Sequence, residues 1–138
     1  MTARSSKRIE LTILSDEAND IAEAIRPKIA DNNDFKDADG HPLLALKQIA
    51  QCPEDINPET VTVLLADPDL ASRIIDTCSA LTWCQSTWAG NAPLLNADKK
   101  NYILTGLKGI FGKLMREYVF AYLLGHARNV KAFEQNQR

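Results

Sequence analysis

The sequence predicts an all-α protein, a compact stack or bundle of about five to seven short helices, from two kinds of observation. The first is a pair of helix-start signals, Asn57-Pro58-Glu59 and, ten residues later, Asp67-Pro68-Asp69. Asn or Asp caps free amide groups, Pro fits the first helical position, and an acid meets the positive end of the helix dipole. The second is the spacing of apolar residues, which recur every three or four positions along most of the chain. Both observations indicate short helices packed side by side.

Two further helices are expected before these starts. Ser15 is an N-cap residue, and the isoleucines that follow it recur at intervals of four. Pro27 lies within that pattern and is expected to kink or end the helix. The segment 31–40, rich in Asp, Asn and Gly, is expected to be a surface loop. Pro42 then opens a leucine-rich helix that ends at about residue 51.

The beginning of the chain has a different pattern. Residues 8–14 alternate between apolar and polar side chains, which is typical of a short strand or of an arm that lies against another chain. The expected organisation is an N-terminal arm over residues 1–14, a single helical domain over 15–128, and a polar, frayed tail over 129–138.

A long loop is expected over residues 82–95, where both tryptophans occur. Loops of this length are often functional, so Trp83 and Trp88 are candidate partner-binding residues. The alternative is that the two rings fold back as lids over helix ends, where they bury a large apolar area.

Three glycines precede the strongest helix of the sequence. Gly106, Gly109 and Gly112 would share one side of a continuous helix, which suggests close approach of another helix backbone. Alternatively, Gly106 ends the helix that Asn96 caps and that is expected to run through residues 101–104, and the next helix begins after it. From residue 113 to about 128 a broad apolar face predicts a long helix.

Composition and charge restrict the class of protein. The chain has 138 residues, 45% of them hydrophobic and 25% charged, which is typical of one globular domain. Three cysteines in no metal-binding spacing indicate reduced thiols in a cytoplasmic protein. Residues 1–8 are not followed by the apolar core of a signal peptide, and no apolar run is long enough to span a membrane. Residues 1–96 hold 8 Lys and Arg against 15 Asp and Glu, whereas residues 97–138 hold 8 against 3.

The order of motifs over residues 42–124 resembles the front portion of an HDOD domain, a helical and non-catalytic relative of the HD phosphohydrolases met in bacterial signalling proteins. The chain departs from the family at Cys78, where the family tends to have Asn, and it is similar to a truncated or minimal version. The resemblance implies a regulatory interaction role and no catalytic residues. It rests on His41-Pro42, Cys52-Pro53-Glu54-Asp55, Asp67-Pro68-Asp69-Leu70, Ser79-Ala80 and Asn101-Tyr102-Ile103-Leu104.

The residues themselves also predict a protein that is not an enzyme. A metal centre of the HD type needs several imidazole and carboxylate ligands, and neither His41 nor His126 lies beside an Asp. Asp67 and Asp69 are explained as a helix cap and a dipole partner. No glycine-rich phosphate loop follows a strand, so no cofactor is expected.

Two functions remain from these observations. The first is a signalling or regulatory protein–protein interaction module, expected to form a homodimer through the apolar face of the C-terminal helix. Its candidate partner-binding residues are Trp83, Trp88, Lys108, Lys113 and Arg116. The alternative is a nucleic-acid-binding protein that contacts phosphates through Lys99, Lys100, Lys108, Lys113, Arg116, Arg128 and Lys131. No membrane partner is expected.

Overall fold

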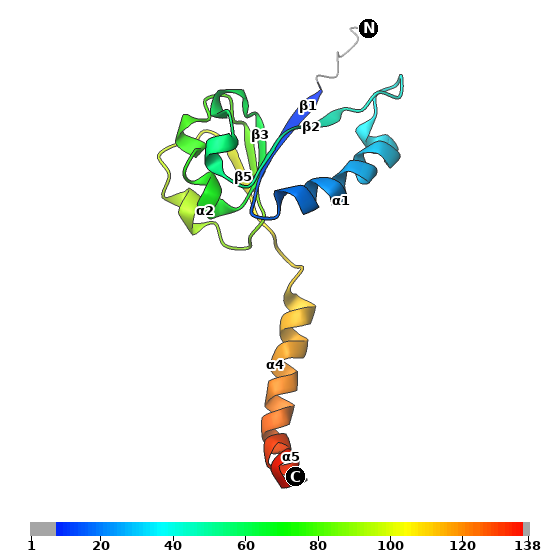
Figure 1. The fold of residues 1–138 in the computed structure, drawn as a ribbon, viewed down its shortest axis with the longest axis vertical. Coiled ribbons are helices and arrows are strands. Elements are labelled where there is room, and N and C mark those ends of the chain that lie inside the picture. The colour runs from blue at the N-terminus through cyan, green and yellow to red at the C-terminus, as the bar shows by residue number, and fades with distance from the viewer. Residues whose placement is uncertain (1–7, 137–138) are drawn as a thin grey trace. The chain divides into compact units, whose positions relative to one another are not determined.

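The computed structural model describes residues 8–136, and it is an α/β protein (Figure 1). The prediction of an all-α stack is therefore wrong. The chain forms two units, Met1–Leu107 and Lys108–Arg138. Residues 1–7 of the expected N-terminal arm and the last two residues of the tail lie outside the described residues.

A five-stranded parallel sheet forms the centre of the first unit. Its strand order is β2-β1-β3-β4-β5, the order of a doubly wound, Rossmann-like fold. The alternating segment near the N-terminus is a strand, as its pattern indicates, but it is paired on both sides rather than isolated. The strands are β1 (Ile9–Leu14), β2 (Leu44–Ala50), β3 (Val63–Ala66), β4 (Trp83–Ser86) and β5 (Ile103–Thr105).

The connections between the strands are short except for the first. Helix α1 joins β1 to β2, and the later connections contain single turns of α-helix or 3-10 helix. They are α1 (Ala18–Asp31), η1 (Asn33–Phe35), η2 (Pro53–Asp55), η3 (Pro58–Thr60), α2 (Pro68–Ala71), η4 (Ile75–Thr77) and α3 (Ala92–Leu95).

Three segments that were expected to be helices contain strands. The reason is that a parallel strand in this sheet is covered on both faces. Such a strand is a nearly continuous apolar run, and a short run of this kind also fits helical spacing. The expected helix after Pro42 is β2, and the helix expected through residues 101–104 overlaps β5. The Asn57 signal opens only the single turn η3, in which the Asn57 side chain accepts the Glu59 amide, and β3 follows.

The helix-start signal at Pro68 does open a helix, but α2 lasts one turn. Helix α1 is present where the isoleucine spacing predicts it, and it continues through Pro27 to Asp31. Of the two outcomes expected for Pro27, a kink or an end of the helix, the second is therefore wrong.

The core lies on the two faces of the sheet. On one face, Ile13 packs with α1 through Ala18 and Ala22. On the other, Leu64 and Cys84 belong to a larger buried cluster covered by the connections from η2 to α3. Alternate residues of each strand point to opposite faces, and β1, β2 and β3 each contribute to both clusters.

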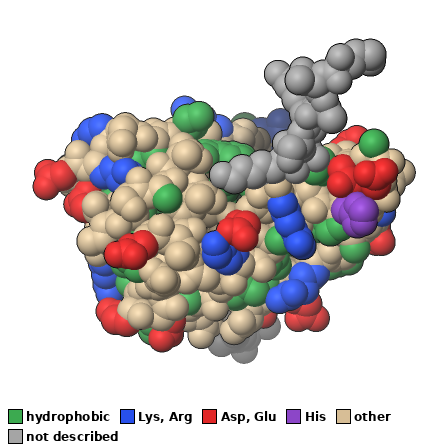
Figure 2. Space-filling model, turned by 90° about the horizontal axis from the view of Figure 1, so that it is seen from above, with side chains coloured by type: hydrophobic (Ala, Val, Ile, Leu, Met, Phe, Trp, Pro, Cys, Tyr) green, Lys and Arg blue, Asp and Glu red, His purple; other side chains and the backbone are tan. Residues whose placement is uncertain are grey.

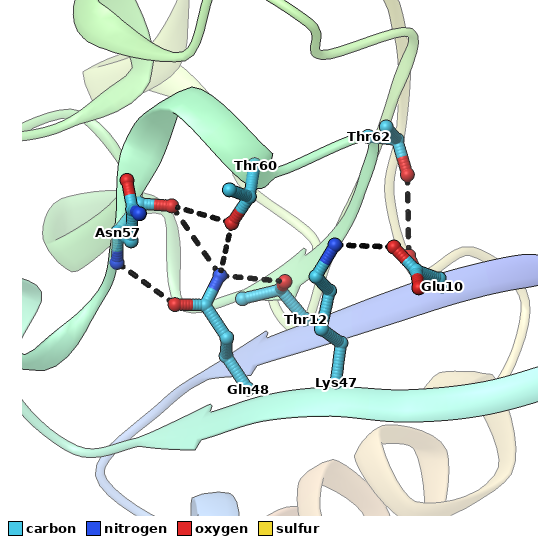
Figure 3. A network of polar contacts seen from close by, with 7 residues as sticks. All are labelled: Glu10, Thr12, Lys47, Gln48, Asn57, Thr60 and Thr62. Atoms are coloured by element: carbon cyan, nitrogen blue, oxygen red, sulfur yellow. Dashed lines mark hydrogen bonds and ion pairs between the residues drawn. The ribbon is translucent and has the colours of Figure 1, made fainter.

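A polar network fixes one of these connections to the sheet (Figure 3). The Gln48 side-chain amide on β2 donates to the Asn57 carbonyl and the Thr60 hydroxyl, both at 3.3 Å, and its oxygen accepts the Asn57 amide at 2.8 Å. Beside it, Lys47 pairs with Glu10 of β1. The strand register shifts here, where Leu11 pairs with Leu46 and Thr12 pairs with Gln48. Lys47 is therefore the extra residue of a β-bulge. The hydrogen bonds between Gln48 and residues Asn57 and Thr60 hold the η3 turn at this bulge.

The second unit consists of α4 (Gly112–Ala127) and α5 (Val130–Asn136). Helix α4 agrees with the long helix expected from residue 113, whereas the expected frayed tail is helical in α5. Asn129, at φ 52°, provides the turn between them. Among the described residues, no helix is both long and apolar enough to cross a membrane.

Leu64→Ala tests the location of the core. Leu64 is fully buried on β3, so the substitution should lower the free energy of unfolding by about 2–5 kcal/mol, through lost transfer energy and the cavity left behind. Urea denaturation measures this change. Leu95→Ala is the matched control, because the Leu95 side chain is 65% exposed, and it should unfold at nearly the wild-type urea concentration. Equal losses in the two variants would contradict this core.

Candidate functional site

Ligands of open parallel sheets bind beyond the carboxyl ends of the strands, where neighbouring connections leave to opposite faces. In this sheet that point lies at β1, which pairs with β2 on one side and with β3 on the other. Helix α1 leaves β1 on one face, and the connection that follows β2 packs on the other. The carboxyl ends of β1, β3 and β4 therefore form the candidate site.

The Asp67 carboxylate links these strand ends. Asp67 directly follows β3 and is only 7% exposed. Its Oδ2 accepts the Asp16 amide at 2.9 Å, just beyond β1, and its Oδ1 accepts the Thr87 hydroxyl, just beyond β4. This differs from the predicted role, because the Asp67 side chain caps no amide of α2. It is an acceptor that holds two neighbouring loops.

A second set of bonds holds the turn after β1. The Gln51 side-chain amide donates to the Asp16 carbonyl at 2.6 Å, and the Ser15 amide donates to the Ala50 carbonyl at 3.2 Å. The Ser15 hydroxyl accepts the Glu17 amide at 3.2 Å. The turn that begins α1 is therefore fastened to the carboxyl ends of both β2 and β3.

The loop that follows β4 is exposed over residues 88–90. The buried Ser86 hydroxyl accepts the Trp88 amide at 3.0 Å and donates to the Trp88 carbonyl at 3.2 Å. Within residues 8–136, the next three amides, those of Ala89, Gly90 and Asn91, donate no hydrogen bond. Successive free amides are typical of a site for a small anion. We call this segment, residues 88–91, the amide loop.

Gly106 allows the chain beyond β5 to pass close to the amide loop. A Cβ atom on Gly106 would lie 2.7 Å from the Asn91 Nδ2 and 3.3 Å from the Trp88 carbonyl oxygen. The Leu107 amide donates to the same carbonyl at 3.3 Å. The close approach expected at these glycines is therefore to a loop and not to a helix. Gly109, at φ 78°, is in a turn, and Gly112 begins α4.

The structure separates the residues proposed from the sequence as partner-binding. Trp88 lies in the amide loop and is 46% exposed, whereas Trp83 begins β4 at the other end of that strand. The Trp83 Nε1 donates to the Thr105 hydroxyl at 2.8 Å, so this ring lies along the sheet. Lys108, Lys113 and Arg116 belong to the second unit. Their role in binding a partner stays a prediction, as does the nucleic-acid interface.

The candidate site did have a signal in the sequence that was missed, namely polar residues at the carboxyl ends of three strands. The pairs Ser15-Asp16 and Ser86-Thr87, together with Asp67, each come at the end of an apolar run. Once these runs are recognised as parallel strands, their polar ends must meet at one edge of the sheet.

The opposite, amino-terminal side of the sheet carries a different polar cluster. Asp37, Asp39 and His41 lie within 4.8 Å of one another in the turn before β2, and Figure 2 shows acidic side chains beside a histidine on the face seen from above. The Asp37 carboxylate accepts the His41 amide at 2.8 Å, and this bond is the main cause of its lowered pKa. The cluster is explained by the turn that it stabilises.

The three thiols differ in burial. Cys52 is exposed, while Cys78 and Cys84 lie in the larger core cluster. Burial raises the pKa of Cys78 to about 11 and that of Cys84 to about 12, because a thiolate is poorly solvated there. The two buried thiols are therefore protonated and act as apolar core residues.

Comparison with known proteins supports this view of the fold. No family model and no curated protein matches the sequence. Among solved structures, the chain is similar to a D-isomer specific 2-hydroxyacid dehydrogenase family protein from Aeromonas salmonicida subsp. salmonicida A449, with a TM-score of 0.73 and 29% identity. The similarity covers 95% of this chain and 39% of that chain. The chain thus spans well under half the length of that protein.

The resemblance to an HDOD domain is therefore wrong, and so is the signalling function that it implied. HDOD domains are helical, whereas the residues that carried the resemblance here include those of a parallel sheet. The motifs at Pro53, Pro58 and Pro68 begin single turns between strands. Helix-start signals do not distinguish a helical stack from the short connections of a parallel sheet.

Asp67→Ala tests the proposed link between the strand ends. Removing the carboxylate leaves the Asp16 amide without an acceptor and leaves the Thr87 hydroxyl only the Ala66 carbonyl, so we expect a loss of about 1–3 kcal/mol in the free energy of unfolding. Amide hydrogen exchange at Asp16 should also accelerate. Asp98→Ala, at an exposed carboxylate, is the control and should change neither quantity. Unchanged exchange at Asp16 in the Asp67 variant would rule out the link.

The thiols provide a second test. In native protein at about pH 8, a thiol reagent should modify Cys52 quickly and the two buried cysteines only after unfolding. The folded-state pKa of both buried thiols is above the ordinary value of 9.0, so the unfolded chain ionises first. The contribution of burial to stability is therefore full below pH 9.0 and is lost as the pH rises toward the folded-state values. Rapid modification of three thiols in folded protein would contradict this assignment.

Proposed function

We propose that this chain binds a small 2-hydroxycarboxylate at the carboxyl edge of its sheet, with the carboxylate on the amide loop. The observation that carries this proposal is the row of three free amides after β4, at the same carboxyl edge of the sheet as the end of β1, where the connections change face. The class of ligand is taken from the similar solved protein, which is described as a 2-hydroxyacid dehydrogenase family member.

The surroundings of the amide loop support binding of a short ligand. The Ser86 hydroxyl holds Trp88 on both its amide and its carbonyl, which fixes the start of the loop. Asp67 and Thr87 fix the neighbouring strand ends and have their own polar atoms paired. A ligand would therefore meet preorganised amides rather than groups that must first be ordered, which lowers the entropic cost of binding.

We further propose that this chain binds its ligand without carrying out a reaction on it. A hydride transfer from a hydroxyl carbon needs a general base that takes the hydroxyl proton, and histidine most often has this role. His41 lies in the turn before β2, at the amino end of the strands, and His126 is in the second unit. The proposal predicts no turnover of D-lactate when the chain is mixed with a nicotinamide cofactor.

A cytoplasmic location is also part of this proposal. Cys52, Cys78 and Cys84 are all free thiols, and two of them are in the core. Free thiols are typical of proteins kept in a reducing compartment.

Titration of isotope-labelled protein with D-lactate, followed by amide NMR, tests the binding site. We expect the largest shifts at Ala89, Gly90 and Asn91, with saturation in the millimolar range for so small a ligand. The Gly40 amide, in the turn before β2, should not move. Propionate tests the contribution of the hydroxyl, and isopropanol, which lacks the carboxylate, should have no effect. Shifts elsewhere with none in the amide loop would overturn the proposal.

A pair of glycine variants tests the amide loop by substitution. Gly106→Ala places a methyl group 2.7 Å from the Asn91 side chain, so it should displace the loop and weaken D-lactate binding by about tenfold or more. Gly112→Ala, outside the amide loop at the start of α4, is the matched control, because its Cβ would meet nothing within 4 Å, and it should bind normally. Equal affinity in both variants, with folding intact, would show that the ligand binds elsewhere.

A further inference from the structure

One face of the sheet is covered only in part. Strand register places Val63, Trp83 and Ile103 in one row across β3, β4 and β5, on the same face as the residues that pack under α1. Helix α1 reaches as far as Leu65 on β3. Beyond it, Trp83 is 41% exposed and Ile103 is 65% exposed. We call the surface formed by the row Val63, Trp83 and Ile103 the open face.

The opposite face has no such opening. There the connections from η2 to α3 bury Leu64 and Cys84 completely. A parallel sheet is normally covered on both faces, because each strand presents apolar side chains to both. Within residues 8–107, no element covers the open face. Neighbouring strands lie about 4.8 Å apart and a helix is about 10 Å wide, so the strip over β4 and β5 accommodates one helix.

Helix α4 has an apolar surface that is exposed. Its apolar side chains occupy more than half of its circumference, and no residue within it is buried. A helix that is apolar over most of its surface is normally found inside a protein. The exposed large side chains of α4 are Leu114, Met115, Tyr118, Val119, Phe120, Tyr122, Leu123 and Leu124.

We propose that two copies of this chain form a dimer in which α4 of each copy packs on the open face of the other. Opposite charges favour this pairing: residues 8–107 hold 8 Lys and Arg against 16 Asp and Glu, whereas residues 108–138 hold 6 against 2. The exchange is reciprocal, so it closes into a two-fold symmetric dimer and leaves neither surface exposed.

The segment between β5 and α4 is suited to such an exchange. It contains Gly106 and Gly109, and the latter adopts a φ of 78° that most residues avoid. Exchange of one element between identical chains adds few new contacts beyond those that a single copy would make, so it is a low-cost route to a dimer. The second copy is also a partner that is always present with the chain.

Light scattering of the full chain at tens of micromolar tests the association, and a dimer is expected. Ile103→Glu on the open face and Val119→Glu on α4 should each produce a monomer. Leu95→Glu is the matched control: Leu95 is as exposed as Ile103, at 65%, but lies on α3 over the opposite face of the sheet. This variant should remain a dimer. Circular dichroism verifies that each variant is folded.

Disulfide trapping distinguishes the exchanged arrangement from two α4 helices paired with each other. One copy carries Ile103→Cys and the other carries Val119→Cys, both with Cys52→Ser to remove the exposed thiol. Mild oxidation of the mixture should yield a disulfide-linked pair of one chain of each kind. Copies carrying Val119→Cys alone should not cross-link efficiently.

Three results would overturn the proposal: a monomeric wild-type chain, a dimer that tolerates Ile103→Glu, or efficient cross-linking between two α4 helices. A monomeric wild-type chain in which α4 covers the open face of its own copy would overturn the proposal in the same way. None of these outcomes bears on D-lactate binding by the amide loop, so the dimer and the proposed function are tested separately.

Discussion

The requirement that a parallel sheet be covered on both faces accounts for most features of this protein. Strand β1 pairs on both sides and its last three residues are buried, so it needs connections that cover it on both faces. The change of face at β1 brings the polar ends of β1, β3 and β4 together. The same requirement makes exposed Trp83 and Ile103 exceptional. The core, the candidate site and the proposed dimer thus follow from one constraint.

The sequence predicts correctly the elements in which local pattern and tertiary structure agree. The isoleucine spacing after Ser15 gives α1, and the broad apolar face after Gly112 gives most of α4. The alternation before Leu14 gives β1. In each case the pattern extends far enough along the chain to distinguish a helical from an extended period.

The remaining strands could not be identified in this way. Strands β3, β4 and β5 have only three or four residues each, and a run of that length fits both periods. The capping signals near Asn57 and Asp67 are chemically sound, but they open single turns between strands. For the same reason the candidate site was missed: Asp67 was explained as a helix cap, and its partners, Asp16 and Thr87, become neighbours only when the sheet forms.

Nuclear Overhauser contacts within the backbone test the central claim, that residues 9–105 form a parallel sheet with β1 paired on both sides. The register predicts contacts between the backbones of Ile13 and Leu65 and between those of Ile13 and Ile49, with slow amide exchange throughout β1. Sequential contacts typical of a helix over residues 44–50, with rapid exchange over residues 9–14, would contradict it.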